Sequence, residues 1–438
     1  MAAELPFTAE RPGVDTAKRP DTSGTANDVA LFEAYAGMIN PTYPSFLSRL
    51  GLNKPAQTAE GATIIDSDGN SYIDCVAGYG AFNLGHNHPA IIRAMTDQLC
   101  RRQLFTRPLI TEIQVRMAES LEDVTPGELK CSFVVNSGSE AIDSALKLVR
   151  LHKGPGTIIT ATNSFHGHTF GALAASGMPS FKRAFEPLAT GFVHVPFGDI
   201  EALEKSIHAD TAAVMIEPVQ HEAGVNMPGK DYLPQLRRLC DRNNLILIFD
   251  EIKTGFGKTG RMFACDHFET VPDILVVGKS LGGGLMPIGA VVAKEHLWRK
   301  FGLSFPMSAS TFAGNALACR AGIETIRLIR QHALPEASAK KGEFLLKQFR
   351  RCIEEFPKIL RAANGLGLLI GVETHSSTVA LNLAQEIIRQ KVLAVPAFAN
   401  PSVLMFEPPL VVSSEQINQV AHKFAAACER INAEGRTE

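Results

Sequence analysis

A lysine and an aspartate, each placed directly after a run of apolar residues, are the residues of this sequence best suited to chemistry. Lys279 follows the apolar run 274–277 and precedes glycines 282–284, so its amine would lie at a strand end where a ligand can approach the backbone. Asp250 ends the apolar run LILIF. An amine and an acid at two strand ends suit a cofactor that carries an aldehyde and a basic ring nitrogen, and pyridoxal phosphate is such a cofactor.

A candidate phosphate site lies where an apolar strand passes into a helix, at residues 136–141. Ser137, Gly138 and Ser139 are small, so the first backbone N–H groups of the helix stay accessible, and the helix dipole adds positive potential. An ordinary helix cap, made by Ser137 or Ser139 with Glu140, would explain the same residues. The presence of Lys279 and Asp250 in the same chain favours phosphate binding.

Two further residues allow more than one interpretation. Phe165, followed by His166, ends another expected strand, where its ring could stack on a pyridine ring or belong to the core. Asp250 could be a helix cap or a surface acid. However, an acid directly after five apolar residues is expected to be buried and to need a charged partner, which a protonated ring nitrogen would supply.

The elements that would position these residues alternate between strand and helix from Lys130 to Lys294. This alternation predicts an α/β fold with a mostly parallel sheet, helices on its faces and ligands at the carboxyl ends of its strands. Upstream, Asp68-Gly69 predicts a hairpin between two alternating runs, and a helix is expected to begin near Ala90.

The chain is expected to divide into four segments. Residues 1–28 are predicted to be a disordered or loose arm, and residues 29–64 a segment that packs with the small domain. A large cofactor-binding domain is expected over residues 65–330. Amphipathic helices and short strands predict a smaller C-terminal domain over residues 331–438. A chain of 438 residues, 45% of them hydrophobic, can bury cores of this size.

Composition argues against several classes of protein. The net charge of -2 argues against a general nucleic-acid surface. The eight cysteines form no CxxC or CxxxC cluster, so neither a zinc site nor a disulfide framework is indicated. The N-terminal segment is polar, and no run approaches about 18 uninterrupted apolar residues. We therefore expect a cytoplasmic protein without a membrane or nucleic-acid partner.

Taken together, these motifs resemble the class III aminotransferases of fold type I, in order and over about residues 40–430. The motifs are 136–140, 165–167, Glu217-Pro218, Asp250-Glu251, 254–260, Gly278-Lys279 and 311–315. Within the family, the segments HVPFGDIEAL, GRMFACDHF, GGGLMPIGA and FEPPL are most similar to putrescine aminotransferase-like members. The resemblance implies a large domain with a mostly parallel seven-stranded sheet and a smaller α+β C-terminal domain.

The resemblance also implies roles for individual residues. Lys279 would carry the Schiff base and move protons, Asp250 would hold the ring nitrogen, and Phe165 would stack on the ring. Gly138 and Ser139 would bind the phosphate. The remaining expected cofactor contacts are Ser137, His166, Glu217, Lys253 and Thr311, and the expected substrate residues are Tyr79, Phe82, His221, Glu222 and Met405. Thr311 would reach the partner's site, because family members are homodimers, or dimers of dimers, with active sites at the interface.

Three residues depart from the family pattern. Lys253 stands where glutamine is usual, His221 replaces a common glycine, and Met405 stands where an arginine normally grips the substrate carboxylate. Lys253 and His221 could be drift at exposed loop positions. Glu222 loses the arginine that often pairs with it, unless Lys253 or another base serves it. Methionine offers a carboxylate no hydrogen bond, a loss of about 2–4 kcal/mol, so the co-substrate is not expected to be a 2-oxo acid held in the usual way.

Three functions fit these residues. The first is amino-group transfer on an amine or amino acid through a carbanion next to the nitrogen. The second keeps the cofactor but leads to epimerisation, or to γ-elimination with carbon–carbon bond formation, with Lys253 and His221 as new acid/base or anion-binding groups. The third is a non-enzymatic binding or regulatory protein, against which the retained Lys279 and Asp250 argue.

Overall fold

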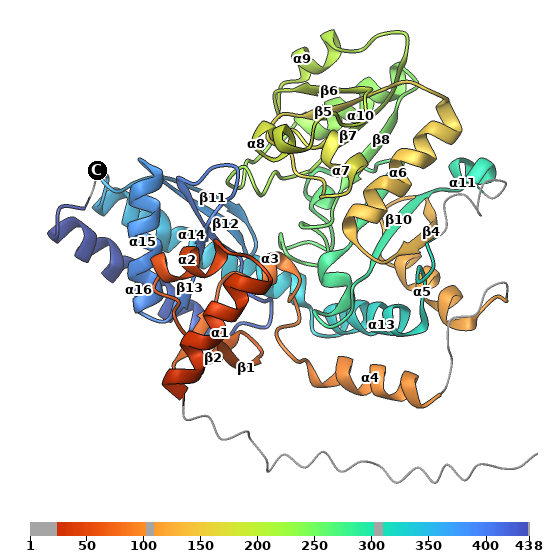
Figure 1. The fold of residues 1–438 in the computed structure, drawn as a ribbon. Helices are drawn as coiled ribbons and strands as arrows, with labels where there is room; N and C mark the ends of the chain where they lie inside the picture. Colours follow the sequence, from red (N-terminus) through yellow and green to blue (C-terminus); the bar gives the residue numbers. More distant parts are fainter. Residues whose placement is uncertain (1–23, 102–108, 302–309, 437–438) are drawn as a thin grey trace, which may run out of the picture.

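The computed structural model describes residues 24–101, 109–301 and 310–436. Figure 1 shows a sheet with helices around it, built from the middle of the chain, beside a second group of helices and strands built from the two ends. None of the helices in the described parts of the chain is both long and apolar enough to cross a membrane.

The central sheet has seven strands and is mostly parallel, as the alternation of strands and helices predicted. Its order is β4 (Leu129–Val135), β10 (Gly289–Lys294), β9 (Ile274–Val277), β8 (Ile246–Asp250), β7 (Thr211–Ile216), β5 (Thr157–Ala161) and β6 (Phe192–Val195). Strand β10 is antiparallel to both of its neighbours, and the other adjacent pairs are parallel. Every residue of β8 and β9 is buried, which explains their unbroken apolar runs.

Helices cover both faces of this sheet, and successive residues of β8 point to opposite faces. Ile248 packs in one core cluster with Ala141 and Ala145 of α6, whereas Phe249 packs in another with Leu236 of α10. The helices of this part are α4 (Pro89–Cys100), α5 (Glu112–Glu122), α6 (Gly138–Lys153), α7 (Phe170–Ala175), α8 (Pro179–Lys182), α9 (Ile200–Lys205), α10 (Tyr232–Arg242), α11 (Glu295–Phe301) and α13 (Ala316–Gln331). The helix expected near Ala90 is therefore confirmed as α4.

A second sheet is built from the C-terminal part of the chain. It is antiparallel, with the order β11 (Leu360–Leu366), β12 (Leu369–Thr374), β15 (Val403–Phe406) and β14 (Val395–Pro396). The helices α14 (Leu334–Glu355), α15 (Ser377–Arg389) and α16 (Ser414–Ala433) pack on it. Phe406 of β15 contacts Phe349 of α14 and Phe424 of α16, with ring centroids 4.5–5.6 Å apart among the three. This aromatic cluster joins the sheet to two of its helices.

The third sheet joins the two ends of the chain. It contains β1 (Ala56–Glu60), β2 (Thr63–Asp66), β3 (Ser71–Asp74) and β13 (Val392–Leu393), and β3 pairs in parallel with β13. Strands β2 and β3 form the hairpin predicted at Asp68-Gly69. This sheet combines strands from both sides of residue 65 with a strand that follows residue 331. The domain limits expected at residues 65 and 331 therefore stay a prediction.

The N-terminal arm expected over residues 1–28 lies mostly outside the described residues, but its last part begins a helix. Helix α1 (Gly24–Met38) precedes α2 (Tyr43–Arg49). Asp28 is buried and accepts hydrogen bonds from Lys54 at 3.1 Å and Ser67 at 2.9 Å. The prediction of a loose arm is therefore wrong for Asp28, because Lys54 and Ser67, from distant positions in the sequence, hold its side chain. Short helical segments complete the fold: α3 (Ala77–Gly80), η1 (Arg183–Phe185), η2 (Ala264–Phe268) and η3 (Lys279–Gly282).

Candidate active site

Lys279 lies where β9 ends, at the start of η3, and its side chain is half-buried. It lines a cavity of about 160 Å³, and among the described residues its amine has no hydrogen-bond or ion-pair partner. Its φ of +43° is unusual for a residue with a side chain, and such strain is concentrated at functional sites. Burial and the positive charge of Lys253 lower the pKa of Lys279 to about 8, although Glu222 opposes the shift. The site therefore holds an unpaired amine that loses its proton easily.

Asp250, the last residue of β8, lines the same cavity. One carboxylate oxygen lies 2.7 Å from Nδ1 of His166, and the other accepts a hydrogen bond from the backbone N–H of Ile252 at 3.0 Å. Burial disfavours the charged form of His166, but the hydrogen bond and attraction of Asp250 raise its pKa overall. Asp250 is buried and paired with His166, so the helix-cap and surface-acid interpretations are wrong. The two contacts fix the carboxylate at the cavity wall.

The start of α6 supports both interpretations of the segment around Gly138. Ser137 caps the helix, since its hydroxyl accepts a hydrogen bond from the backbone N–H of Glu140 at 3.1 Å. The N–H groups of Gly138 and Ser139 come earlier in the helix, where they have no acceptor within it, and both residues line the cavity. A Cβ on Gly138 would lie 3.0 Å from the side chain of Ile252. The helix is capped, and two free backbone donors are left at the cavity.

Phe165 and Glu217 form another wall of the cavity. Phe165 is half-buried, so it is not a core residue, and its backbone N–H donates to Glu217 at 3.1 Å. Its ring meets Phe181 edge to face, with centroids 6.0 Å apart, and Phe181 in turn meets Phe398 at 6.5 Å. The aromatic wall therefore extends beyond the residues that the sequence singled out. Phe181 and Phe398 gave no signal in the sequence because neither belongs to a motif.

His221 is the base that serves Glu222. Its Nε2 lies 2.6 Å from a carboxylate oxygen of Glu222, and its Nδ1 lies 3.6 Å from Glu217. Burial would raise the pKa of Glu222, but the attraction and hydrogen bond of His221 hold it well below its usual range. His221 is buried, so the interpretation of this residue as drift at an exposed loop position is wrong.

Lys253 has a different partner, which the sequence did not reveal. It lines the cavity, is 5% exposed, and forms an ion pair with Glu407, a buried residue that follows β15. The end of its side chain lies against Gly80, where a Cβ would come within 3.0–3.2 Å of it. Lys253 is therefore not at an exposed loop position either. Spacing along the chain could not reveal Glu407, because the pair is brought together only by the fold.

Five predicted residues are not among the residues that line the cavity: Tyr79, Phe82, Glu222, Met405 and Thr311. Phe82 packs tightly between Gly78 and Gly284, where an added Cβ would lie 2.3 and 2.4 Å from its ring. Tyr79 lies 5.5 Å from Phe398, centroid to centroid, and burial raises the pKa of Tyr79 to about 12.

Met405 packs in a small apolar cluster with Val219 and Val403, which explains how a thioether is accommodated there. Thr311 is exposed, in the turn before α13. The substrate roles of Tyr79, Phe82, Glu222 and Met405 and the phosphate role of Thr311 stay predictions.

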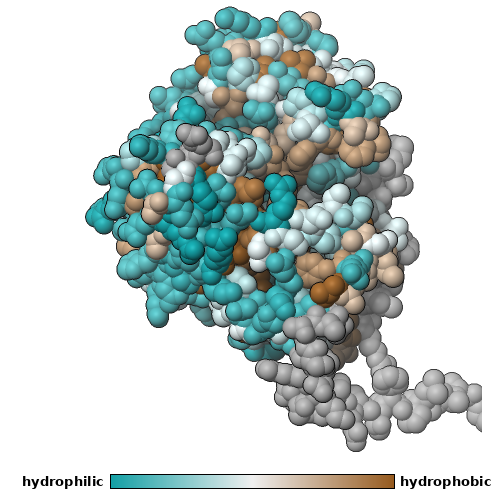
Figure 2. All heavy atoms as spheres, turned by 60° about the vertical axis from the view of Figure 1, so that its left-hand side comes forward, coloured by the Kyte–Doolittle hydropathy of each residue, from teal (hydrophilic) through white to brown (hydrophobic). Residues whose placement is uncertain are grey.

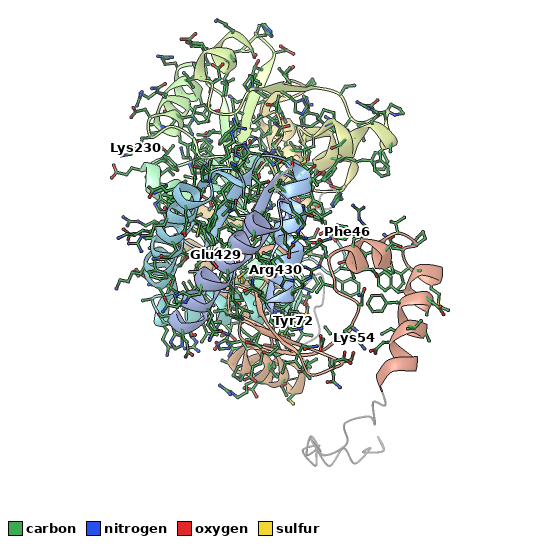
Figure 3. All side chains as sticks on the ribbon, turned by 90° about the vertical axis from the view of Figure 1, so that its left-hand side faces the viewer. Phe46, Lys54, Tyr72, Lys230, Glu429 and Arg430 are labelled. Carbon is green, nitrogen blue, oxygen red and sulfur yellow. The ribbon has the colours of Figure 1, made fainter. Side chains whose placement is uncertain are left out.

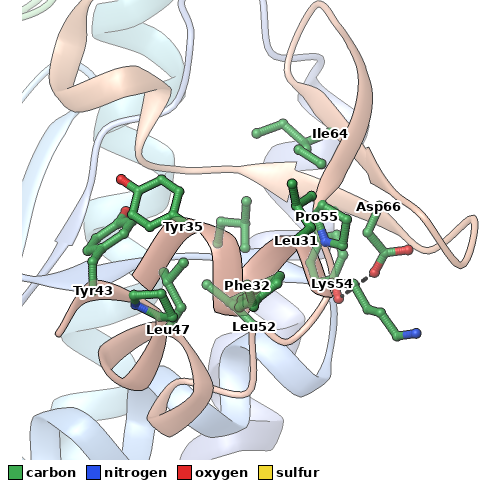
Figure 4. A pocket seen from close by; sticks show the side chains of 14 residues that line it. Leu31, Phe32, Tyr35, Tyr43, Leu47, Leu52, Lys54, Pro55, Ile64 and Asp66 are labelled. Atoms are coloured by element: carbon green, nitrogen blue, oxygen red, sulfur yellow. Dashed lines mark hydrogen bonds between the residues drawn. The ribbon is translucent and has the colours of Figure 1, made fainter. Parts of the chain in front are cut away.

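A larger cavity, of about 310 Å³, lies under α1 and α2 (Figure 4). Its lining is mostly apolar, from Leu31, Phe32 and neighbouring residues, with Lys54 and Asp66 at its edge. Lys54 is already paired with Asp28, and Asp66 accepts hydrogen bonds from Asn70. The cavity at Lys279 is the better candidate for chemistry, because its polar groups converge on one small space.

The residues at the cavity fit pyridoxal phosphate. The amine of Lys279 is available for the aldehyde, the carboxylate of Asp250 for the ring nitrogen, and the ring of Phe165 for a flat contact. The free N–H groups of Gly138 and Ser139 suit a phosphate. A Cβ on Gly278 would come within 3.3 Å of the backbone of Gly138, so the glycine at 278 eases the close approach of this segment to the start of the helix.

Comparison with known proteins agrees with this geometry. The family model for class-III aminotransferases matches residues 51–428. The chain is a class-III aminotransferase. It is 41% identical, over 379 residues, to a putrescine aminotransferase of Pectobacterium atrosepticum, covering 84% of this chain and 81% of that protein. This confirms the resemblance seen in the sequence.

Solved structures give the same fold. The ornithine aminotransferase of Toxoplasma gondii has a TM-score of 0.85 and 28% identity, with 93% of this aminotransferase and 96% of that chain covered. A transaminase from the marine bacterium Virgibacillus has a TM-score of 0.86 and 24% identity, with 92% and 99% covered. The fold is therefore that of the fold type I transferases, and this aminotransferase is a pyridoxal-phosphate-dependent enzyme that transfers amino groups.

Proposed function

We propose that this aminotransferase acts on a primary amine, or on an amino acid whose carboxylate is not held by an arginine. The observation that supports this most directly is the cavity lining, which includes no arginine among the described residues. Met405, at the position of the usual arginine, lies in an apolar cluster. The relative from Pectobacterium atrosepticum is a putrescine aminotransferase, and putrescine is an amine without a carboxylate.

In the proposed reaction, the residues of the cavity divide the work. When bound, pyridoxal phosphate supplies an electron sink for the bond next to the substrate nitrogen. Lys279 moves the proton from the substrate carbon, and its lowered pKa makes a larger share of the amine neutral, and so able to accept that proton, than for an ordinary lysine. Asp250, fixed by His166, holds the ring nitrogen protonated. The N–H groups of Gly138 and Ser139 bind the phosphate, and Phe165 covers one face of the ring.

The alternative, epimerisation or γ-elimination with carbon–carbon bond formation, needs additional acid/base groups. Lys253 and His221 would supply them, but both are already engaged with carboxylates, those of Glu407 and Glu222. To act as an acid or base, each would have to leave its buried carboxylate with no carboxylate in its place, which favours amino-group transfer.

We further propose a homodimer, or dimer of dimers, in the cytoplasm. Thr311 is exposed and does not line the cavity of its own chain, which fits a role in the site of a second copy. Exposed apolar residues support an interface at the N-terminal helices and the loop between them. They are Val29, Leu31, Met38, Ile39 and Phe46. Figure 2 shows an otherwise mostly hydrophilic face with hydrophobic residues gathered in patches.

The test is a half-reaction with a panel of amines and amino acids. The loaded enzyme absorbs at about 400–430 nm, and transfer of the amino group converts this band to one at about 330 nm. We expect that conversion with at least one amine, a product in which a carbonyl replaces the amine, and no conversion in Lys279→Ala. If no donor gives the 330 nm band, transfer is not the reaction. A product that keeps its nitrogen would favour the alternative.

A further inference from the structure

Besides the reactive Lys279, the described lining of the cavity contains one other lysine, Lys253, that could bind an incoming anion. Among the described residues that line it, the lysines are Lys279 and Lys253, and no arginine is present. The ammonium of Lys253 contacts the carboxylate of Glu407, which does not itself line the cavity. Lys253 therefore lies between the open space of the site and a buried acid.

Glu407 has a second cationic neighbour. Lys258 is fully buried, and its ammonium donates hydrogen bonds to the backbone oxygens of Glu407 and Pro408 at 3.2 and 2.9 Å. Lys258 stays beside Glu407 through these backbone contacts, so once it carries its proton, the carboxylate of Glu407 keeps a positive neighbour if Lys253 turns away. Losing one partner would not leave this acid isolated in the interior, which is the costly outcome for a buried charge.

The other groups that could hold an anion are occupied or apolar. His221 is paired with Glu222, and Met405 lies in an apolar cluster. Lys253 has a long flexible side chain, and its end packs directly against Gly80, which has no Cβ to obstruct it. An exchange of one carboxylate for another would keep the lysine paired throughout.

We propose that Lys253 binds the carboxylate of the amino-group acceptor, exchanging Glu407 for the substrate. This proposal rests on the amino-group transfer proposed above and names its acceptor class: a carbonyl compound that carries a carboxylate. The donor amine needs no such contact. The same cavity therefore takes an amine whose far end is uncharged or positively charged in one half-reaction, and an acceptor that carries a carboxylate in the other.

The exchange has a consequence for protons. Burial lowers the pKa of Lys258 to about 7; among its neighbours, Glu407 raises it and Lys253 lowers it further, while Asp74 and Cys75 raise it. Asp74 is itself engaged with His86 at 2.8 Å. When Lys253 leaves Glu407, its positive charge moves away from Lys258, and the carboxylate of Glu407 is no longer neutralised by Lys253. Both changes favour the charged form of Lys258, so binding of a carboxylate takes up a proton at neutral pH and above.

The test is calorimetric binding of glutarate, a dicarboxylate with neither an amine nor a carbonyl, to the enzyme loaded with pyridoxal phosphate. We expect Lys253→Met to weaken binding by at least about tenfold, and Glu407→Gln to strengthen it, because the competing charge is gone. The exposed Lys230, labelled in Figure 3, provides the matched control, and Lys230→Met should bind as the wild type does. Repeating the titration in buffers of different ionisation enthalpy should reveal proton uptake by the wild type.

The opposite signs separate binding from a purely structural role. If the ion pair only supports the fold, both single variants weaken glutarate binding together, and the proposal is wrong. It is also wrong if the wild type does not bind glutarate at millimolar concentration, or if Lys253→Met binds it unchanged. Should a single variant fail to fold, the double variant Lys253→Met with Glu407→Leu removes both buried charges and should fold without binding. The amine half-reaction is measured separately, so failure of amino-group transfer would be distinguished from failure of this proposal.

Discussion

The lowered pKa of Lys279 predicts how fast the enzyme, once stripped of pyridoxal phosphate, captures it covalently. Only the neutral amine attacks an aldehyde. With a pKa of about 8, about one molecule in ten carries the neutral amine at pH 7, compared with about one in three thousand for an ordinary lysine of pKa 10.5. The capture rate at pH 7 should therefore exceed that of an exposed lysine by about 300-fold, if both amines have equal access.

The assay follows absorbance after mixing apoenzyme with the cofactor across a range of pH, with borohydride trapping and peptide mass spectrometry to locate the attachment. We expect the rate to rise with a midpoint near pH 8. Lys253→Met removes a neighbouring positive charge and should move the midpoint up. Glu222→Gln removes a negative one and should move it down.

An inflection near pH 10, or a downward shift in Lys253→Met, would refute the electrostatic reasoning. Attachment at a residue other than Lys279 would refute the assignment of the site itself.

Three other changes test the surroundings. His166→Asn should destabilise the protein by about 3 kcal/mol, because Asp250 loses its buried partner. Folding raises the pKa of His166, so the stabilisation by protonated His166 is complete below pH about 6.5 and is lost as the pH rises through its pKa in the folded protein. The difference in Tm between the wild type and His166→Asn should therefore shrink in alkali. Gly167→Ala should weaken cofactor binding by about tenfold, measured by equilibrium dialysis, since its Cβ would lie 2.2 Å from the hydroxyl of Ser139. Met405→Arg should lower the free energy of unfolding by about 3 kcal/mol or more, measured as a lower Tm, because the position is packed in apolar residues. For the same reason it should not restore tight binding of 2-oxo acids.

Much of the fold could be predicted from local pattern. Strands β8 and β9 are buried on both faces, so their apolar runs were unbroken, and the acid and the lysine that end them could be recognised as facing a site. The hairpin at Asp68-Gly69 and the start of α4 also followed from turn and helix-start signals. The exception was the start of α1, where the buried contacts of Asp28 outweigh a polar local sequence.

The contacts within the site could be predicted only in part. The sequence indicated that Glu222 needs a new base, but not that the adjacent His221 supplies it while Lys253 turns to Glu407. The ion-pair partner of a buried lysine is determined by the elements that the fold brings next to it. Phe82 gives the same lesson, because two glycines far apart in the sequence, at 78 and 284, enclose its ring.

The parallel pairing of β3 with β13 also affects how the protein is made. Strand β3 leaves the ribosome early, whereas its partner emerges only after most of the chain has been synthesised. One edge of the early hairpin must therefore wait unpaired during translation, which exposes it to association with other nascent chains and to capture by chaperones. A chain that terminates before β13 would keep that edge open permanently, so truncated products should aggregate rather than accumulate as a folded amino-terminal half.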